Sequence, residues 1–278
     1  MKVAMMSYTL GRGRAASERL NLPWVCAFTR ELGLDGVDWV TTHGHDPVEV
    51  RRVMDDHGLR TVCYTFFADL NCATAEARAP GVEVARRELE TALVLGTDKI
   101  MLPIGGKPGS TREQSLAHTL AGVAQVIELA RPCGLTVTVE HHPQPGSPFI
   151  TSADMNRGIA ELPELRVTFD SGNPVTDGES AAAAYRGSAD YVVHAHFKDW
   201  KPSAPGERGG WQGLDGNWRV GEVVGEGQVD NLAATALMLE HGYDGYVDFE
   251  YEGVNMSPEA ACRRGIPHMR EWFEGELP

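Results

Sequence analysis

The chain has 278 residues, 42% of them hydrophobic and 23% charged, which is typical of a soluble globular protein with a large buried core. Its formal net charge of −14 predicts a surface that repels phosphate backbones and so disfavours nucleic-acid binding. No run of 18 apolar residues predicts a transmembrane helix, and the apolar patch at the start is too short for a signal peptide. We therefore expect a cytoplasmic protein without membrane or nucleic-acid partners, whose five cysteines stay reduced.

Short β-branched runs alternate with longer amphipathic stretches along the chain. In chain order, the sequence predicts strand 2–7, helix 18–32, strand 36–40, helix 48–57, strand 60–66, helix 81–95, strand 99–103, helix 111–130, strands 135–140, 166–170 and 191–197, helix 231–240, strand 246–251 and helix 258–273. Asp230 and Ser257 are the expected N-caps of the last two helices. Several helices are followed by a glycine before the next strand.

Eight strands in β–α alternation predict an α/β protein with a single (β/α)8 TIM barrel over residues 1–278. A doubly wound open sheet is the alternative, but the first strand is not followed by a glycine loop of dinucleotide spacing. One insertion breaks the rhythm at residues 201–227, after the seventh strand, and is rich in Gly, Pro, Trp and charge. We expect it to form a lid or a substrate wall; a solvated insertion is the other reading.

Four ligand-type side chains stand at the ends of apolar runs: Glu140, Asp170, His196 and Glu250. Because parallel strands of a barrel end at the same face, we expect them to converge there. Three carboxylates and one imidazole favour one divalent ion, with manganese expected first and cobalt, magnesium or zinc as alternatives. Four protein ligands leave an octahedral ion two positions, which suits the adjacent oxygens of a hydroxy-ketone.

Neighbouring residues are candidate substrate contacts. His142 and Lys198 each lie two residues after a candidate ligand and so share its face of the strand. His194, two before His196, is expected to lie one layer down with a structural role. The remaining expected contacts are Tyr8, Asn173 and Trp200.

The segments VTVEHHP, VTFDSGN, HAHFKDW, GEGQVD and GYVDFEYEG, with the early turn ELGLDGVDW, resemble the xylose-isomerase-like TIM-barrel superfamily of sugar phosphate isomerases and epimerases. The resemblance covers nearly the whole chain. It implies that Glu140, Asp170, His196 and Glu250 bind the metal, and that the two glutamates also exchange the substrate proton. The implied function is a metal-dependent isomerase or epimerase of carbohydrate metabolism, which acts next to the carbonyl of a keto-sugar or related polyol.

Three positions depart from the ketohexose 3-epimerases of that superfamily. Asn173 replaces a histidine, Gly146 a glutamate and Pro202 an arginine, so the shell that holds a free ketohexose is missing. The HFKD motif looks more like the group that includes inosose dehydratases and unassigned sugar isomerases.

Other readings follow from the same parts. A metal-dependent dehydratase of the inosose or dehydroshikimate type is the main alternative, because loss of a β-hydroxyl can follow the same proton abstraction. An abasic-site endonuclease, which uses several more histidines for three zinc ions, is disfavoured by this acidic chain with only 10 histidines. A non-catalytic sugar-binding protein is a remote alternative, since both glutamates are present. The sequence is compatible with a homo-oligomer.

Overall fold

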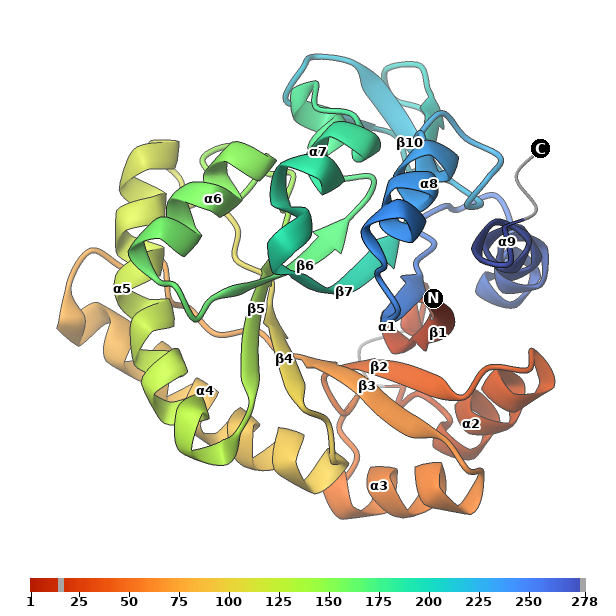
Figure 1. Cartoon of the computed structure of the whole chain (residues 1–278), viewed down its shortest axis with the longest axis horizontal. Coiled ribbons are helices and arrows are strands. Elements are labelled where there is room, and N and C mark those ends of the chain that lie inside the picture. Colours follow the sequence, from red (N-terminus) through yellow and green to blue (C-terminus); the bar gives the residue numbers. More distant parts are fainter. Residues whose placement is uncertain (15–17, 276–278) are drawn as a thin grey trace.

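The barrel predicted from the sequence is the central feature of the computed structural model, which describes residues 1–14 and 18–275. Within these residues, eight parallel strands close in the order β1-β11-β7-β6-β5-β4-β3-β2, and helices surround them (Figure 1). The barrel strands are β1 (Lys2–Met6), β2 (Gly36–Val40), β3 (Arg60–Thr65), β4 (Lys99–Leu102), β5 (Thr136–Glu140), β6 (Arg166–Asp170), β7 (Val192–Phe197) and β11 (Tyr246–Phe249). All the predicted barrel strands are confirmed to within two residues at either end.

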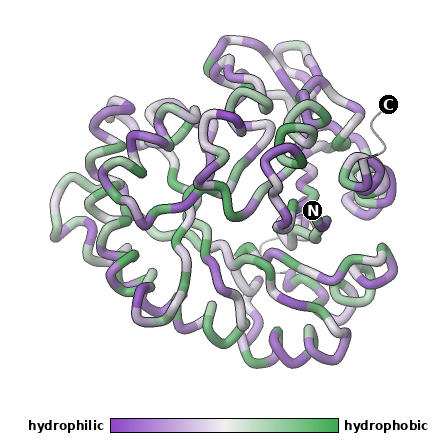
Figure 2. Tube along the Cα trace, viewed as in Figure 1, coloured by the Kyte–Doolittle hydropathy of each residue, from purple (hydrophilic) through white to green (hydrophobic). Residues whose placement is uncertain are grey.

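The outer layer consists of helices that bury one face against the strands. They are α1 (Ser7–Gly11), α2 (Leu22–Glu31), α3 (Pro47–Asp56), α4 (Ala75–Leu95), α5 (Arg112–Ala130), α6 (Ser152–Glu161), α7 (Ala181–Ser188), α8 (Asn231–His241) and α9 (Pro258–Phe273), with short 3-10 turns at 131–133, 174–177 and 189–191. Along the outer helices hydrophilic and hydrophobic residues alternate (Figure 2), as expected where one face is buried. Among the described helices, none is long and apolar enough to cross a membrane.

Two predicted helix starts are wrong, and capping residues explain both. The side chain of Asn21 accepts a hydrogen bond from Trp24 N, so α2 begins at Leu22 rather than at residue 18. The hydroxyl of Thr74 accepts from Ala77 N, so α4 begins six residues before the predicted start at 81. Helices α6 and α7 are not among the predicted elements.

Asp230 has a different role from the one expected of an N-cap. Its side chain makes no cap hydrogen bond in α8. Instead its carboxylate accepts from the backbone N–H groups of Ala181 (2.8 Å) and Ala182 (3.3 Å), at the start of α7. The same physical preference, a carboxylate at a helix N-terminus, is therefore met on the neighbouring helix.

The segment after β7 folds into a small antiparallel sheet in the order β8-β10-β9. Its strands are β8 (Asp199–Pro202), β9 (Trp211–Gln212) and β10 (Trp218–Glu222). Asp199 ties this sheet to the chain that follows it, because its carboxylate accepts from the N–H groups of Gly225, Gly227 and Val229 at 2.9–3.1 Å. A side chain at Gly227 would collide with this carboxylate, so glycine is required there.

Candidate functional site

The four strand-end residues meet as the sequence predicts. Glu140 and Asp170 end β5 and β6, His196 is the last residue but one of β7, and Glu250 directly follows β11. His196 Nδ1 lies 3.4 Å from Glu140 Oε2 and 3.9 Å from Glu250 Oε2. Ligand atoms of Glu140, Asp170 and His196 all lie within 4.8 Å of one another. The side chains are buried, with Asp170 and His196 fully so.

Unpaired buried atoms indicate that this cluster fits a divalent cation. Over residues 1–14 and 18–275, His196 Nδ1 and Glu250 Oε2 are buried and have no hydrogen-bond partner, and the partner of Asp170 Oδ2 is the ammonium of Lys198, 3.0 Å away. Buried polar atoms in proteins are nearly always paired, so two unpaired atoms in one cluster call for a physical reason. Carboxylate oxygens and an imidazole nitrogen are suitable ligands for a hard or borderline divalent ion.

Lys198 supplies positive charge within the cluster. Its buried ammonium lies 3.0 Å from Asp170 Oδ2 and 3.0 Å from Glu250 Oε1. Burial raises the pKa of Glu250 to about 8 and that of Asp170 to about 6, although Lys198 acts in the opposite direction on both. Burial also opposes ionisation of Glu140, but the nearby imidazole of His196, together with the charge of Lys198, outweighs it and lowers the pKa of Glu140.

A second polar layer lies beneath the cluster inside the barrel. Its residues come two positions before each candidate ligand, on the same face of each strand, and are Thr138, Thr168, His194 and Asp248. All are buried, as expected for His194. Asp38 of β2 joins this layer, with Oδ2 3.4 Å from His194 Nε2 and 3.3 Å from His196 Nε2.

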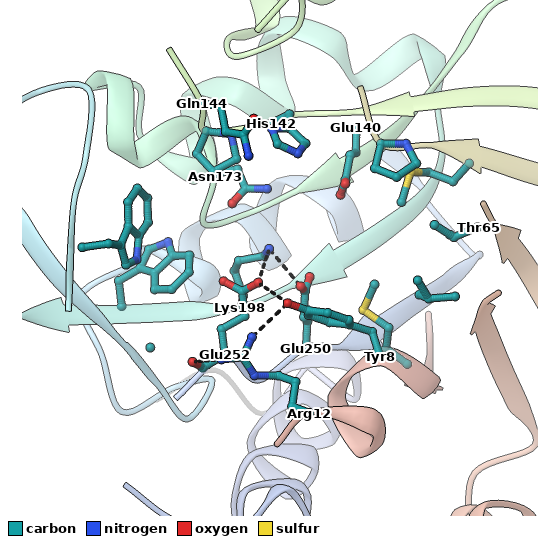
Figure 3. Close-up of a pocket in the computed structure, with 18 of the residues that line it drawn as sticks. Tyr8, Arg12, Thr65, Glu140, His142, Gln144, Asn173, Lys198, Glu250 and Glu252 are labelled. Carbon is teal, nitrogen blue, oxygen red and sulfur yellow. Dashed lines mark hydrogen bonds and ion pairs between the residues drawn. The ribbon is translucent and has the colours of Figure 1, made fainter. Parts of the chain in front are cut away.

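A cavity of about 460 Å³ opens above the cluster. The expected substrate contacts all line it, together with both glutamates (Figure 3): Tyr8, His142, Asn173, Lys198 and Trp200. In Figure 3 the carboxylates of Glu140 and Glu250 point toward each other across the cavity. A volume of this size is usual for a small-molecule site.

Hydrogen bonds to backbone groups hold the side chains of Asn173 and Trp200, which follow Asp170 and His196 in the chain. The amide of Asn173 donates to the His141 carbonyl at 2.7 Å, and its own N–H donates to Asp170 Oδ1 at 2.8 Å. The indole N–H of Trp200 donates to the Gly172 carbonyl at 2.9 Å. A side chain at Gly172 would collide with Lys198 and Trp200, so glycine lets β6 and β7 bring these residues together.

Trp211, from the insertion expected to form a lid or a substrate wall, lines the cavity, whereas four other cavity residues were not expected from the sequence: Arg12, Phe67, Gln144 and Glu252. Arg12 donates to Tyr8 Oη at 2.9 Å and to the Glu252 carbonyl at 2.8 Å, and Tyr8 Oη lies 3.4 Å from Glu252 Oε1 (Figure 3). Glu252 had a detectable signal, because it lies two residues after Glu250 and so continues the same face. Arg12 follows the short helix α1 and gave no such signal.

Comparison with known proteins identifies the family to which the barrel belongs. Residues 26–272 match the family model described as xylose isomerase-like TIM barrel. An inosose dehydratase from Lacticaseibacillus casei is 25% identical over 134 residues, which cover 47% of this chain and 45% of that enzyme. The chain thus matches less than half the length of this relative.

Solved structures show the same fold at low sequence identity. The apo form of the 3-keto-D-glucoside 4-epimerase YcjR from E. coli superposes with a TM-score of 0.75, at 19% identity, over 97% of this chain and 99% of that one. The IolI protein with a binding zinc atom superposes with a TM-score of 0.78, at 15% identity, over 99% of each chain. Because the family model matches residues 26–272 and the structure is a closed eight-stranded barrel, the chain belongs to the xylose isomerase-like TIM-barrel family.

Proposed function

We propose that the protein is a divalent-metal-dependent sugar isomerase or epimerase, which transfers a proton next to the carbonyl of a keto-sugar or related polyol. The observation that carries the proposal is the pair Glu140 and Glu250, whose buried carboxylates face one cavity from opposite sides beside His196. Two carboxylates on opposite faces of one carbon are what inversion of a hydroxyl-bearing centre requires.

The metal would be held by Glu140, Asp170, His196 and Glu250. When bound, a divalent ion supplies Lewis acidity toward a carbonyl oxygen and so makes the neighbouring C–H more acidic. We expect manganese first among the ions that suit this donor set, with cobalt, magnesium and zinc as alternatives.

The residues of the chain itself then have separate roles. One of Glu140 and Glu250 removes the proton from the carbon beside the carbonyl, and the other returns a proton from the opposite face. The ammonium of Lys198, between Asp170 and Glu250, is placed to donate to an oxygen on which negative charge develops. His142, Asn173 and Tyr8 hold the remaining hydroxyl groups, and Trp200, whose indole N–H already donates to the Gly172 carbonyl, forms an apolar wall that excludes water.

A screen in deuterated water tests the proposal. Metal-loaded protein is incubated with a panel of keto-sugars and inososes, and mass spectrometry measures deuterium at the carbon beside the carbonyl. We expect exchange with at least one compound, and a loss of roughly 10²- to 10⁴-fold in Glu140→Gln or Glu250→Gln. Glu164→Gln on the exposed surface is the matched control. If the metal-loaded protein exchanges no hydrogen on any compound, the proposal is wrong.

A dehydratase is the second candidate, and the match to an inosose dehydratase is the observation that favours it. The first step is the same proton removal, after which a β-hydroxyl leaves as water with a proton from an acid such as Lys198. The product is a conjugated enone. New ultraviolet absorbance in the same screen would identify a lyase, whereas deuterium exchange without it would identify an isomerase or epimerase.

A further inference from the structure

The buried layer beneath the metal-type cluster has an unusual composition for the inside of a barrel. In it Asp38, His194 and Asp248 lie together and contact His196 of the cluster above, and each of these four side chains is 0–1% exposed. Hydrophobic or hydroxyl-bearing side chains would fill the same space at lower cost, because charged groups are expensive to bury. The contacts of His196 account for this composition.

The two ring nitrogens of His196 face different layers. Nδ1 faces the cluster, 3.4 Å from Glu140 Oε2, and over the described chain it has no hydrogen-bond partner. Nε2 faces the layer beneath the cluster, 3.3 Å from Asp38 Oδ2 and 3.5 Å from Asp248 Oδ2. Nδ1 is therefore the nitrogen available to a metal, and the ring proton belongs on Nε2.

The two aspartates are not equivalent acceptors for that proton. Asp248 Oδ2 lies 2.9 Å from His194 Nε2, which is a normal hydrogen-bond distance and shorter than any contact that His196 makes with either aspartate. The geometry of His196 Nε2 is that of a hydrogen bond to Asp38 Oδ2 at 3.3 Å, whereas its 3.5 Å contact with Asp248 Oδ2 is an ion pair only. Thr65 Oγ1, 3.4 Å from Asp38 Oδ1, helps to hold the Asp38 carboxylate from the other side.

We propose that Asp38 is a positioning residue that accepts a hydrogen bond from the Nε2–H of His196 and thereby presents Nδ1 to the metal. The inference rests on the metal centre proposed above. Without Asp38, the nearest carboxylate to this buried N–H would be Asp248, whose Oδ2 lies 3.5 Å away, beyond the normal range of a hydrogen bond. The neutral ring would then favour a proton on Nδ1, where it faces Glu140 and competes with the ion.

The test uses the full-length protein, stripped of metal with a chelator and titrated with zinc alone. Affinity is measured by chelator competition, and metal content by elemental analysis. We expect Asp38→Ala to bind zinc roughly 10- to 100-fold more weakly, the usual range for loss of such a partner, with Asp38→Asn less affected because its amide oxygen still accepts a hydrogen bond. Thr138→Val is the matched control: it removes a buried hydroxyl from the same layer, bonded to Thr168 at 2.7 Å, that does not touch His196.

Nuclear magnetic resonance of the zinc-loaded protein gives a readout that a general loss of stability would not mimic. The Nε2–H proton of His196 should be downfield and slow to exchange in wild type and in Thr138→Val. It should shift or exchange faster in both Asp38 variants. If Asp38→Ala does not fold, as judged by circular dichroism, zinc affinity and the Nε2–H signal are measured on Asp38→Asn instead.

Three outcomes would overturn the inference. One is zinc affinity and an Nε2–H signal in the Asp38 variants equal to those of Thr138→Val. Another is two zinc ions per wild-type chain, one of them lost in Asp38→Ala, which would make the lower layer a metal site in its own right. The third is a wild-type protein that binds no metal, which would overturn the proposed metal centre as well as the positioning role. If the wild-type protein binds zinc and the Asp38 variants bind it equally well, only the positioning role is overturned.

Discussion

Lys198 places its ammonium 3.0 Å from the Glu250 carboxylate, the group that we propose as one of the two proton carriers. The same nitrogen lies 3.0 Å from Asp170. Lys198 therefore stabilises two carboxylates that a divalent ion would also bind. This gives one residue two opposing effects, one on metal affinity and one on the reaction.

Lys198→Met separates these effects. Removing the ammonium abolishes its repulsion of the ion and its competition for the carboxylates, so metal affinity should rise. The rate of substrate-proton exchange should fall by about 10²-fold or more, because a donor to the developing charge is lost. Chelator competition and deuterium exchange measure the two quantities. Lys107→Met, which removes an ammonium paired with Asp69 at 2.7 Å on the partly exposed loops, should change neither. Weaker metal binding in Lys198→Met would contradict the prediction.

Metal affinity should rise with pH. In the metal-free protein the pKa is about 8 for Glu250 and about 6 for Asp170, and both groups must be ionised to bind an ion. Affinity should therefore increase as the pH rises through this interval and level off above it. Isothermal titration with zinc, in buffers of different ionisation enthalpy, measures the affinity and the protons released. Glu250→Gln should flatten the upper part of the profile, and an unchanged profile would argue against the assignment.

The stability of the metal-free protein should change in the opposite direction. Because the folded pKa of Glu250 lies above its ordinary value of 4.5, the folded state binds more protons than the unfolded state between these two values. This group's contribution to the free energy of unfolding is therefore full below 4.5 and is lost as the pH rises toward about 8. Urea unfolding with and without metal should show that the difference in free energy of unfolding between the metal-bound and metal-free protein increases with pH. A constant difference would contradict this.

Asp199 should be a stabilising residue of the small antiparallel sheet. Asp199→Ala leaves the N–H groups of Gly225, Gly227 and Val229 without their acceptor. We expect a loss of at least about 1–3 kcal/mol in the free energy of unfolding, measured with urea. Asp56→Ala, which breaks an exposed pair with Arg52 on α3, should cost less than about 1 kcal/mol. Equal effects of the two substitutions would remove the special role of Asp199.

Trp211 should affect substrate binding without affecting the metal. It lines the cavity and packs edge-on against Trp200, with ring centroids 5.3 Å apart. Trp211→Ala should raise KM by a few-fold to about tenfold, with kcat and metal affinity close to wild type. Trp24→Ala on α2, where the ring stacks on Phe28 away from the cavity, is the control. A fall in metal affinity in Trp211→Ala would place this residue nearer the metal than we infer.

The barrel and the ligand cluster are predictable from the sequence because they depend on strand periodicity. A parallel barrel brings strand ends to one face whatever the loops do, so Glu140, Asp170, His196 and Glu250 converge from position alone. The two-residue repeat also places His194 one layer below His196. The residues named from strand register as candidate ligands therefore lie together in the structure, whereas Asp38, on β2, lies in the layer beneath them and does not line the cavity.

Elements that depend on local capping or on loops were harder to predict. Pro80 lies near the start of α4 and interrupts its apolar pattern, so the helical residues before it, which Thr74 caps, are not predicted from the sequence. Helix α7 is short and begins with four alanines, which carry no amphipathic period. Arg12 and Glu252 meet across 240 residues through irregular backbone. No spacing rule predicts such a contact.

Asp199 has a consequence for how the substrate range of such a barrel can change. Its carboxylate, at the start of β8, accepts hydrogen bonds from Gly225 and Val229, which follow the small antiparallel sheet. The two ends of the inserted segment are therefore held together independently of the residues between them. Replacement of residues 201–221 as a single cassette, which includes the cavity residues Gly209 and Trp211, should change which ligand fits the cavity while Glu140, Asp170, His196 and Glu250 stay in place. The insertion is thus a natural unit for exchange between relatives, whether by recombination in evolution or by design in the laboratory.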